Sequence, residues 1–400
     1  MIEADVAIIG AGAAGLSLAH RLCLPAPGAR PARRPSVVLV TAPPGPLRPP
    51  ARTWCFWEAG RGRFDAAVTT AWRRLRVHPP TGEPIEDDIS PLRYKMIRSD
   101  DFECLVEHDL TRTGRVRRLE AVVDDVEGVA DGARVHARTA SGSSRCVQAR
   151  WVFDSRPLGS LPAARTTLLQ HFHGWFVRTP RPVFDPARAD LMDFRTAQPA
   201  TGLSFGYLLP TGTRQALVEY TEFSPAVLSA DAYEKALRHY TGSVLGLTDF
   251  EVTATETGVI PMTDARFARR TGDSVFRIGT AGGATRPSTG YTFAGVQRQT
   301  AAVAAALGQG RRPVPPQPHP LRSRAMDAVL LHALDSGLVD GAAFFARLFT
   351  RVPMTRLLRF LDGETRPHEE LGIGLHTPVL PMLRAAAAVP LLPRRPFPGP

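Results

Sequence analysis

The hydrophobic pattern of the first forty residues predicts a strand, a helix and a second strand, in that order. Residues 5–9 (DVAII) are a short apolar run that predicts a buried strand, and residues 16–22 continue as a helix. Residues 36–40 (SVVLV) predict the next strand. This order is typical of a parallel sheet with helices on its faces, because parallel strands need a crossover connection.

Later in the chain the hydrophobic pattern is different. Residues 173–179 (HGWFVRT) and 215–223 (QALVEYTEF) alternate apolar and polar positions, which predicts an antiparallel sheet. Residues 308–320 are proline-rich and predict a linker. Amphipathic helices are predicted after the linker, in residues 326–337, 341–352 and 354–363. We therefore expect an α/β fold, with an α+β substrate part and a C-terminal helical region.

The net charge of the 400-residue chain is +11, from 49 Lys and Arg against 38 Asp and Glu. Lys occurs only at Lys95 and Lys235 and Asn does not occur, so the many arginines reflect a composition bias. The sequence contains no basic helix with interleaved aromatic residues and no zinc-finger spacing. We expect neither nucleic-acid binding nor a metal site.

The cysteines and the apolar stretches indicate a cytoplasmic chain. The cysteines are Cys23, Cys55, Cys104 and Cys146. They form no C-x-x-C pair, and no signal peptide precedes the first strand, so we expect four reduced thiols. Residues 385–393 are apolar but too few to span a bilayer, which takes roughly 20 residues, and Pro390 interrupts them.

A glycine-rich turn joins the first strand to its helix. Gly10, Gly12 and Gly15 fit the pattern G-x-G-x-x-G directly after the strand. In this motif the glycines allow a tight turn, a close approach to a pyrophosphate and helix packing. We expect this turn, with Ala14, to bind a dinucleotide; the alternative is a tight turn without a ligand. The next strand ends at Thr41 instead of an acidic residue, and its hydroxyl can still bond a ribose.

A second glycine-rich loop lies far along the chain, in residues 279–291 (GTAGGATRPSTGY), with a predicted helix from about residue 292. Two such loops suit an extended FAD that one discontinuous domain holds at both ends. An NAD dehydrogenase would instead carry its catalytic residues in a following domain. The helix N-terminus would favour negative charge, so we expect it to stabilise reduced, anionic flavin.

A third segment, residues 94–110 (YKMIRSDDFECLVEHDL), predicts a strand that ends at Arg98 and a helix with Ser99 or Asp100 as its N-cap. It resembles the segment of the FAD monooxygenase-like superfamily in which an arginine lies near the cofactor. The alternative for Arg98 is a surface residue at a strand end.

Six blocks of sequence resemble those of bacterial lycopene cyclases and occur in the same order. The blocks are residues 52–58 (RTWCFWE), 152–157 (VFDSRP), 191–195 (LMDFR), 206–224 (GYLLPTGTRQALVEYTEFS), 256–262 (ETGVIPM) and the A-G-x-x-x-P-x-T-G-Y pattern of residues 281–291. On these blocks the chain is identified as a member of the lycopene β-cyclase family. Arg52 and Arg286 depart from the family pattern, since His is common at both positions.

The resemblance implies a redox-neutral reaction on lycopene and related acyclic carotenoids. A terminal double bond is protonated, the cation closes a six-membered ring, and loss of the C6 or the C4 proton gives a β or an ε ring. It also implies that FAD must be reduced, with NAD(P)H as the electron donor. The other cofactor contacts that the resemblance implies are Asp154, Ala281, Gly282, Pro287, Thr289, Gly290 and Tyr291.

Glu219 matches the acidic residue on which the family relies. Val218 and Tyr220 should face away from it in an alternating strand, and burial among hydrocarbon would raise its pKa, so that it can act as a general acid. The alternative is a solvated glutamate on an edge strand. We expect Glu222 to be solvated, and Glu256 either to support Glu219 or to form a salt bridge at a strand end.

The expected domain limits follow from these assignments: residues 1–165 and 255–310 bind FAD, residues 166–254 form the antiparallel substrate part, and residues 311–400 form the linker and helical cap. Asp154 and Arg156 are expected to support loop geometry or FAD. The oligomeric state, the ring isomer and the number of rings formed stay open.

Residues 377–400 place apolar side chains beside Arg384, Arg394 and Arg395, which indicates peripheral membrane binding; the alternative is a tail packed on the protein.

Two other functions stay open. One is an FAD-dependent oxidoreductase of the same superfamily, a monooxygenase or a prenyl reductase, which would be expected to have Gly-Asp in place of Gly279-Thr280. The other is a flavin-binding carrier without catalysis.

Overall fold

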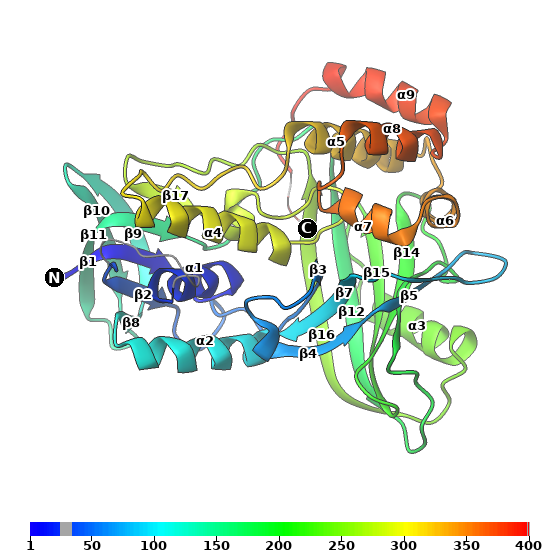
Figure 1. Cartoon of the computed structure of the whole chain (residues 1–400), viewed down its shortest axis with the longest axis horizontal. Coiled ribbons are helices and arrows are strands. Elements are labelled where there is room, and N and C mark those ends of the chain that lie inside the picture. The colour runs from blue at the N-terminus through cyan, green and yellow to red at the C-terminus, as the bar shows by residue number, and fades with distance from the viewer. Residues whose placement is uncertain (25–33, 398, 400) are drawn as a thin grey trace.

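Three β-sheets and a layer of C-terminal helices make up the fold in the computed structural model, which describes residues 1–24, 34–397 and 399 (Figure 1). One sheet lies with the N-terminal helices at one end of the molecule. A long antiparallel sheet lies at the other end, and the third, smaller sheet lies between them. The predicted α/β fold with a parallel sheet, an antiparallel sheet and C-terminal helices is confirmed.

The first sheet is parallel at its centre. β1 (Ile2–Ile9) runs parallel to β2 (Val37–Thr41) on one side and to β11 (Ser144–Asp154) on the other. The outer strands are β8 (Val116–Glu120), β9 (Val122–Val129), β10 (Gly132–Arg138) and β17 (Val275–Arg277). Residues 37–40 are buried throughout, because a layer of apolar side chains packs on both faces of the sheet.

Two helices that are far apart in the sequence cover one face of this sheet. α1 (Ala13–Cys23) follows β1, and α4 (Phe293–Gly308) packs beside it from the second half of the chain. Their apolar residues share one hydrophobic core with β1 and β2. The two glycine-rich loops therefore begin neighbouring helices.

The antiparallel sheet has the strand order β16, β12, β15, β14, β13, β5, β6. Its strands are β5 (Arg74–His78), β6 (Ile85–Asp88), β12 (Thr167–Arg178), β13 (Arg188–Asp193), β14 (Leu203–Pro210), β15 (Gln215–Ser224) and β16 (Glu251–Thr263). Only β13 and β5 pair in parallel among the described strands of this sheet. One face packs on α3 (Ala230–His239) and the following helical turn η2 (Tyr240–Val244). The other face points toward the smaller sheet and the C-terminal helices.

The smaller sheet joins the two ends of the molecule. It consists of β3 (Thr53–Ala59), β4 (Val68–Trp72) and β7 (Leu92–Arg98), all antiparallel, with η1 (Asp65–Ala67) before β4. Successive residues of β3 belong to different cores, since Phe56 packs with the first sheet and Trp57 packs with the antiparallel sheet. α2 (Ser99–Thr113) follows β7 and begins at the expected place, with Arg98 as its N-cap instead of Ser99 or Asp100.

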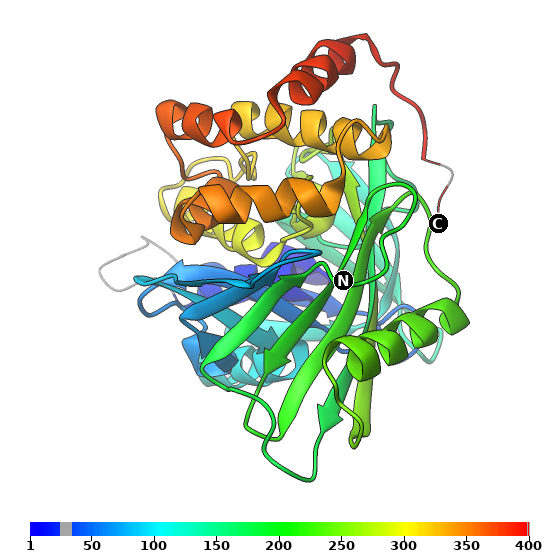
Figure 2. The same cartoon turned by 90° about the vertical axis from the view of Figure 1, so that its right-hand side faces the viewer.

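The C-terminal helices lie across the upper edge of the antiparallel sheet (Figures 1 and 2). They are α5 (Leu321–Asp335), α6 (Gly341–Arg351), α7 (Met354–Leu361), α8 (Pro367–Leu375) and α9 (Val379–Ala388), followed by η4 (Val389–Leu391). Phe344, Phe345 and Leu348 of α6 are buried, while Arg347 and Arg351 of the same helix are exposed. Within the described residues, none of the helices combines the length and apolar character needed to cross a bilayer.

The domain limits expected from the sequence stay a prediction. β5 and β6 join the antiparallel sheet although they precede residue 166. β16 begins in this sheet and ends beside the second glycine-rich loop, so it runs through the expected limit at residues 254 and 255. The antiparallel sheet is therefore assembled from more of the chain than residues 166–254.

Candidate active site

The first glycine-rich turn has the geometry of a phosphate-binding loop. Gly10 has a φ of 96°, which favours glycine, and a Cβ at residue 15 would lie 1.8 Å from the Gly10 carbonyl oxygen. Gly12 is the N-cap of α1, and no described atom lies within 4 Å of the position that its Cβ would take. No side chain of the described residues caps this helix. The N-terminal amides of α1 can therefore bind an anion in the space beside Gly12.

Thr41 and Asp154 end the strands on either side of β1. The buried Oγ1 of Thr41 has no hydrogen-bond partner among the described residues, so it can bond a ligand hydroxyl. Asp154 instead forms an ion pair with Arg156, at 2.8 Å between Oδ2 and Nη2, which supports the expected role in loop geometry. Ser155 was missed from the sequence: a Cβ at Gly10 would lie 2.4 Å from its Oγ, so it closes the back of the turn.

The second glycine-rich loop lies against the first. It starts with η3 (Gly279–Gly282) at the end of β17, and a Cβ at Gly279 would lie 2.9 Å from the Cβ of Ala14. The side chain of Gln299 in α4 fixes both ends of η3. It accepts from the Gly279 amide at 2.8 Å and donates to the Gly282 carbonyl at 3.1 Å. Ala281 is buried between these two bonds.

The second half of this loop, from Pro287 to Tyr291, reaches the antiparallel sheet. Gly290 has a φ of 71°, and a Cβ there would lie 1.9 Å from Oε1 of Gln170 on β12. That Oε1 and the Oγ1 of Thr289 are buried without hydrogen-bond partners among the described residues. Gln170 was missed from the sequence, although an amide inside the apolar segment 167–172 (TLLQHF) was a usable signal.

Arg286 holds this loop against the C-terminal helices. Its side chain is buried, and Nε lies 2.9 Å from Oδ2 of Asp327 in α5, whose Oδ1 also accepts from the Ser288 hydroxyl at 2.7 Å. A buried guanidinium needs such a partner, because an unpaired charge in the interior is costly. Arg286, one of the two departures from the family pattern, therefore has a buried structural partner.

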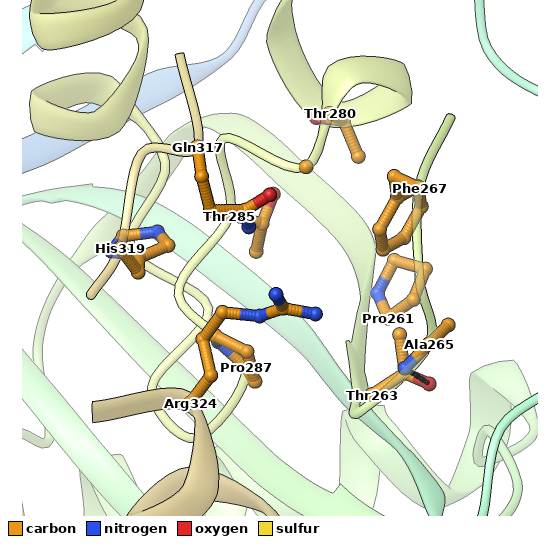
Figure 3. Close-up of a pocket in the computed structure, with 11 residues that line it drawn as sticks. Pro261, Thr263, Ala265, Phe267, Thr280, Thr285, Pro287, Gln317, His319 and Arg324 are labelled. Atoms are coloured by element: carbon orange, nitrogen blue, oxygen red, sulfur yellow. Dashed lines mark hydrogen bonds between the residues drawn. The ribbon is translucent and has the colours of Figure 1, made fainter. Parts of the chain in front are cut away.

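A small basic cavity lies beside the loop, lined by residues of β16, the loop, the proline-rich connection and α5 (Figure 3). Thr280, Thr285 and Pro287 line it from the loop, and Arg324 extends into it from α5. Burial lowers the pKa of Arg324, and the nearby charge of Arg266 lowers it further. The cavity volume is about 20 Å³, which fits a water molecule and not a carotenoid.

Arg98 points toward the antiparallel sheet. Its guanidinium carbon lies 4.7 Å from the centroid of the Phe176 ring on β12, a cation–π contact. Its charge also opposes the rise that burial causes in the pKa of Glu256 on β16. The expected contact of Arg98 with the cofactor stays a prediction.

Glu219 lies in the middle of β15, with Tyr207 of β14 and Gly174 of β12 as its neighbours across the sheet. Its side chain is 9% exposed. Val218 and Tyr220 belong to the core under α3 on the opposite face, as the alternating pattern predicts. The acid therefore points into the interior between the sheets, not into solvent.

The pKa of Glu219 is raised to about 8, mostly by burial and to a smaller extent by the negative charge of Glu256. The Thr221 hydroxyl donates to its Oε1 at 2.7 Å and opposes the shift. No Lys or Arg forms an ion pair with Glu219 among the described residues. An acid that is buried without a cation keeps its proton near neutral pH.

Aromatic side chains from different segments form a cluster that reaches the acid. The hydroxyl groups of Tyr94 on β7 and Tyr291 of the second loop lie 3.2 Å apart, and the Trp57 ring of β3 lies 4.7 Å from the Tyr291 ring. The charge of the acid raises the pKa values of Tyr207 and Tyr291 beyond the effect of burial, so both lie near it. Tyr94 and Trp57 were missed, because a contact between strands so far apart leaves no local pattern.

Glu256 is the second carboxyl group of the site. It lies on β16, opposite Gly174. The amide and the hydroxyl of Thr53 donate to its two oxygens, each at 2.6 Å. Burial raises the pKa of Glu256, while the Thr53 hydrogen bonds and the charges of Arg98 and Arg52 oppose this. Glu256 therefore accepts from the amide and the hydroxyl of Thr53 on β3, and it does not form a salt bridge at a strand end.

The expectation that Glu222 is solvated was wrong. Its side chain is buried on the opposite face of β15 from Glu219, where it accepts from the Tyr220 hydroxyl at 3.0 Å and lies 3.9 Å from His171. The reason is α3, which packs on this face and cannot be placed from the alternation of β15 alone.

All four cysteines are free, and Cys55 lies close enough to Glu219 for the charge of this acid to raise the pKa of the thiol in addition to burial.

Comparisons with known proteins identify the family. A family model described as lycopene cyclase protein matches residues 5–387. The fold is similar to that of a geranylgeranyl bacteriochlorophyll reductase-like protein from Thermoplasma acidophilum, with a TM-score of 0.66 and 13% identity, covering 96% of this chain and 100% of that one. No curated protein matches the sequence significantly.

Two further solved structures have the same fold. One is a flavoprotein/dehydrogenase from Cytophaga hutchinsonii, with a TM-score of 0.58, 14% identity and coverage of 97% of this chain and 99% of that one. The other is p-nitrophenol 4-monooxygenase from Pseudomonas putida, with a TM-score of 0.55, 13% identity and coverage of 99% and 100%. At this identity the similarity establishes the fold of these flavin enzymes and not a shared reaction.

The raised pKa of Glu219 makes a prediction about stability. Between pH 4.5 and about 8 the unfolded chain loses this proton and the folded protein keeps it, so the contribution of Glu219 to stability is lost as the pH rises. Glu219→Gln has no such proton. We expect the free energy of unfolding of Glu219→Gln, relative to wild type, to rise by on the order of a few kcal/mol between pH 5 and pH 9.

Chemical denaturation at several pH values measures this difference. Glu251→Gln, at an exposed position on β16, is the control and should follow wild type at every pH. A constant difference between Glu219→Gln and wild type across this range would contradict the raised pKa.

Proposed function

The chain belongs to the lycopene cyclase family, and we propose that it is a lycopene β-cyclase of carotenoid biosynthesis. It would convert the ψ ends of lycopene to β-ionone rings, through γ-carotene to β-carotene, without net oxidation. One observation carries this proposal: Glu219 is a buried carboxylic acid near Tyr207 and Tyr291, and burial raises its pKa to about 8. Such a group can give a proton to a hydrocarbon that offers no polar atom for binding.

The proposed reaction begins when the Glu219 carboxyl group protonates the terminal double bond of a ψ end. The resulting tertiary cation is attacked by the neighbouring double bond, which closes the six-membered ring. Loss of the C6 proton then forms the ring double bond. The faces of Trp57, Tyr94 and Tyr291 carry negative charge density that stabilises a nearby cation, and their bulk excludes the water that would capture it.

The two glycine-rich loops fit FAD. The open space at Gly12 and the uncapped N-terminus of α1 suit its pyrophosphate, and the unpartnered hydroxyl of Thr41 suits a ribose. The second loop ends at α4, which has no side-chain cap and no acidic residue in its first turn, so negative charge is favoured there. When bound and reduced by NAD(P)H, FAD supplies negative charge beside the substrate, and we expect no cyclisation until it is reduced.

Gly12→Ala tests the cofactor site. A methyl group at this position occupies the space beside the α1 amides and touches nothing else that the structure describes. We expect the flavin content of the purified protein to fall about tenfold or more, with the free energy of unfolding of the flavin-free protein changed by about 1 kcal/mol or less. Absorbance and denaturation measure the two effects. Gly159→Ala, at another uncrowded glycine, should keep its flavin.

Glu219→Gln tests the reaction. The substitution keeps the size and the Thr221 contact but removes the transferable proton, so we expect conversion of lycopene to fall by roughly 10²–10⁴-fold, with flavin still bound. Pigment analysis of lycopene-accumulating cells and of purified protein measures this. Glu222→Gln changes a buried acid on the other face of the same strand and should retain activity. Near wild-type conversion by folded Glu219→Gln would refute the assignment.

The outer C-terminal helices support peripheral membrane binding, which would give access to a substrate that partitions into bilayers. We define the outer leucine patch as the exposed residues Leu371, Leu375, Leu380, Leu383 and Leu391. Of the residues in α9, only Ala385 is buried, and α9 lies on the outside of the molecule beyond α5 (Figures 1 and 2). Arg384 and Arg395 are exposed near the patch in sequence, while Arg394 pairs with Asp264 at 3.2 Å. Arg394 therefore does not contribute the free charge expected from the sequence.

Leu380→Ser/Leu383→Ser tests this binding surface. These side chains are 71% and 60% exposed, so the fold should tolerate the change. In vesicle flotation, we expect wild type to bind vesicles that contain anionic phospholipid, with less binding at higher salt, and the double variant to bind about tenfold more weakly. Leu47→Ser, at an exposed leucine elsewhere, is the control. If wild type does not float with anionic vesicles at low salt, the membrane proposal fails.

A further inference from the structure

Two carboxyl groups face each other across a glycine in the antiparallel sheet. Glu219 on β15 and Glu256 on β16 both pair with Gly174 of the strand between them, β12. Residues in one cross-strand row point to the same face, and two strand spacings separate the two Cα atoms by about 9.6 Å. Both side chains are buried. The pair therefore flanks one interior site.

The side chains of Leu217 and Glu219 lie directly over Gly174. A Cβ at this position would lie 2.9 Å from Cδ1 of Leu217 and 3.4 Å from the Cβ of Glu219. A larger residue at this position would therefore displace these two side chains, and with them the Glu219 carboxyl group.

The environments of the two acids differ in a consistent direction. Glu256 receives two hydrogen bonds from Thr53, one of them from a backbone amide that can only donate, and it lies near the charges of Arg98 and Arg52. These contacts favour the ionised form. Glu219 has one hydroxyl contact and no cation among the described residues, which favours the protonated form. Burial raises the pKa of both acids, but at Glu256 an amide, a hydroxyl and two cations oppose that rise, while at Glu219 one hydroxyl does. Two neighbouring acids whose environments differ in this way suit the roles of an acid and a base.

We propose that Glu256 is the proton acceptor of the cyclisation and that its place across Gly174 from Glu219 determines which ring isomer forms. The inference rests on the proposed function. The sequence left two roles open for Glu256, which were support of Glu219 and an ion pair at a strand end. The inference gives Glu256 a specific role in the reaction.

The proton balance of this step closes within the pair. Glu219 gives its proton to the terminal double bond, and a new carbon–carbon bond closes the ring and leaves the positive charge on the ring carbon C5. The Glu256 carboxylate then takes the C6 proton, and the electrons of that C–H bond form the ring double bond. Glu219 ends ionised and Glu256 ends protonated. Transfer of one proton from Glu256 back to Glu219 restores both, with no oxidation or reduction.

The same cation can lose a proton from C6 or from C4, giving a β or an ε ring. Removal requires a base within hydrogen-bond reach of the proton that leaves. Because Thr53 holds both oxygens of Glu256, the carboxylate has one orientation relative to Gly174. A base in one place selects one of the competing protons.

Glu256→Gln tests the proposal. A glutamine can still accept from the Thr53 amide and donate to the Thr53 hydroxyl. The substitution therefore preserves the hydrogen bonds between β3 and β16 and removes only the base. We expect the rate of β-ring formation by the reduced, flavin-loaded protein to fall by roughly 10²-fold or more. We also expect the remaining product to contain a larger share of ε rings or of end groups hydrated at the cation. Chromatography and mass analysis of the products measure both.

Two further variants complete the test. Glu251→Gln, an exposed acid on the same strand, should match wild type in rate and in ring isomer. Glu256→Asp keeps the charge but withdraws it by one methylene, so it should retain more activity than Glu256→Gln and change the isomer ratio. This second variant also covers the case in which Glu256→Gln does not fold.

The outcomes separate this inference from the proposed function. If wild type does not cyclise lycopene, the proposed function fails. If wild type cyclises and Glu256→Gln forms β rings at the same rate, Glu256 is not the base. If the rate falls but both variants make only β rings, Glu256 holds β3 in place without choosing the proton, and the inference is overturned.

Discussion

A carboxylic acid that is buried without a cation has to keep its proton, and the rest of this site is arranged around that constraint. Glu219 could lower its energy by pairing with an arginine, yet the nearby charges of Arg98 and Arg52 act on Glu256 instead. Thr53 adds two hydrogen bonds to the same carboxylate. The positive charge of the site is thus directed to one acid, while the other remains neutral among aromatic rings. A substrate without polar groups can be activated only by an acid in that state.

This arrangement depends on how the three sheets meet. The small sheet contributes Thr53 and Tyr94, the antiparallel sheet contributes the two acids, and the second loop contributes Tyr291. The Gln299 side chain fixes the start of that loop, and Gly279 of the loop lies against Ala14 beside the first glycine-rich turn. The second loop therefore links the first glycine-rich turn, which its Gly279 end contacts, to the surroundings of Glu219, which its Tyr291 end reaches.

Features that are contiguous in the sequence could be predicted, and features made by distant strands could not. The first glycine turn lies in the eighteen consecutive residues 5–22 with its strand and helix, so its pattern is complete in one segment. The face of Glu219 followed from the alternation within β15. The burial of Glu222 did not, because α3 covers that face from a separate segment. The Thr53–Glu256 contact joins residues that are 203 positions apart, and the family resemblance located both blocks without their contact. The pairing of Arg394 with Asp264 was hidden for the same reason.

The most direct measurement of the central claim is the mass of the product formed from lycopene by the purified protein, with reduced flavin and without oxygen. The account predicts a cyclic product with the same mass as lycopene, since a proton is only moved from one carbon to another. A product that is heavier by two hydrogens would identify a reductase, and a need for oxygen with gain of an oxygen atom would identify a monooxygenase. Either result would contradict proton-initiated cyclisation at Glu219.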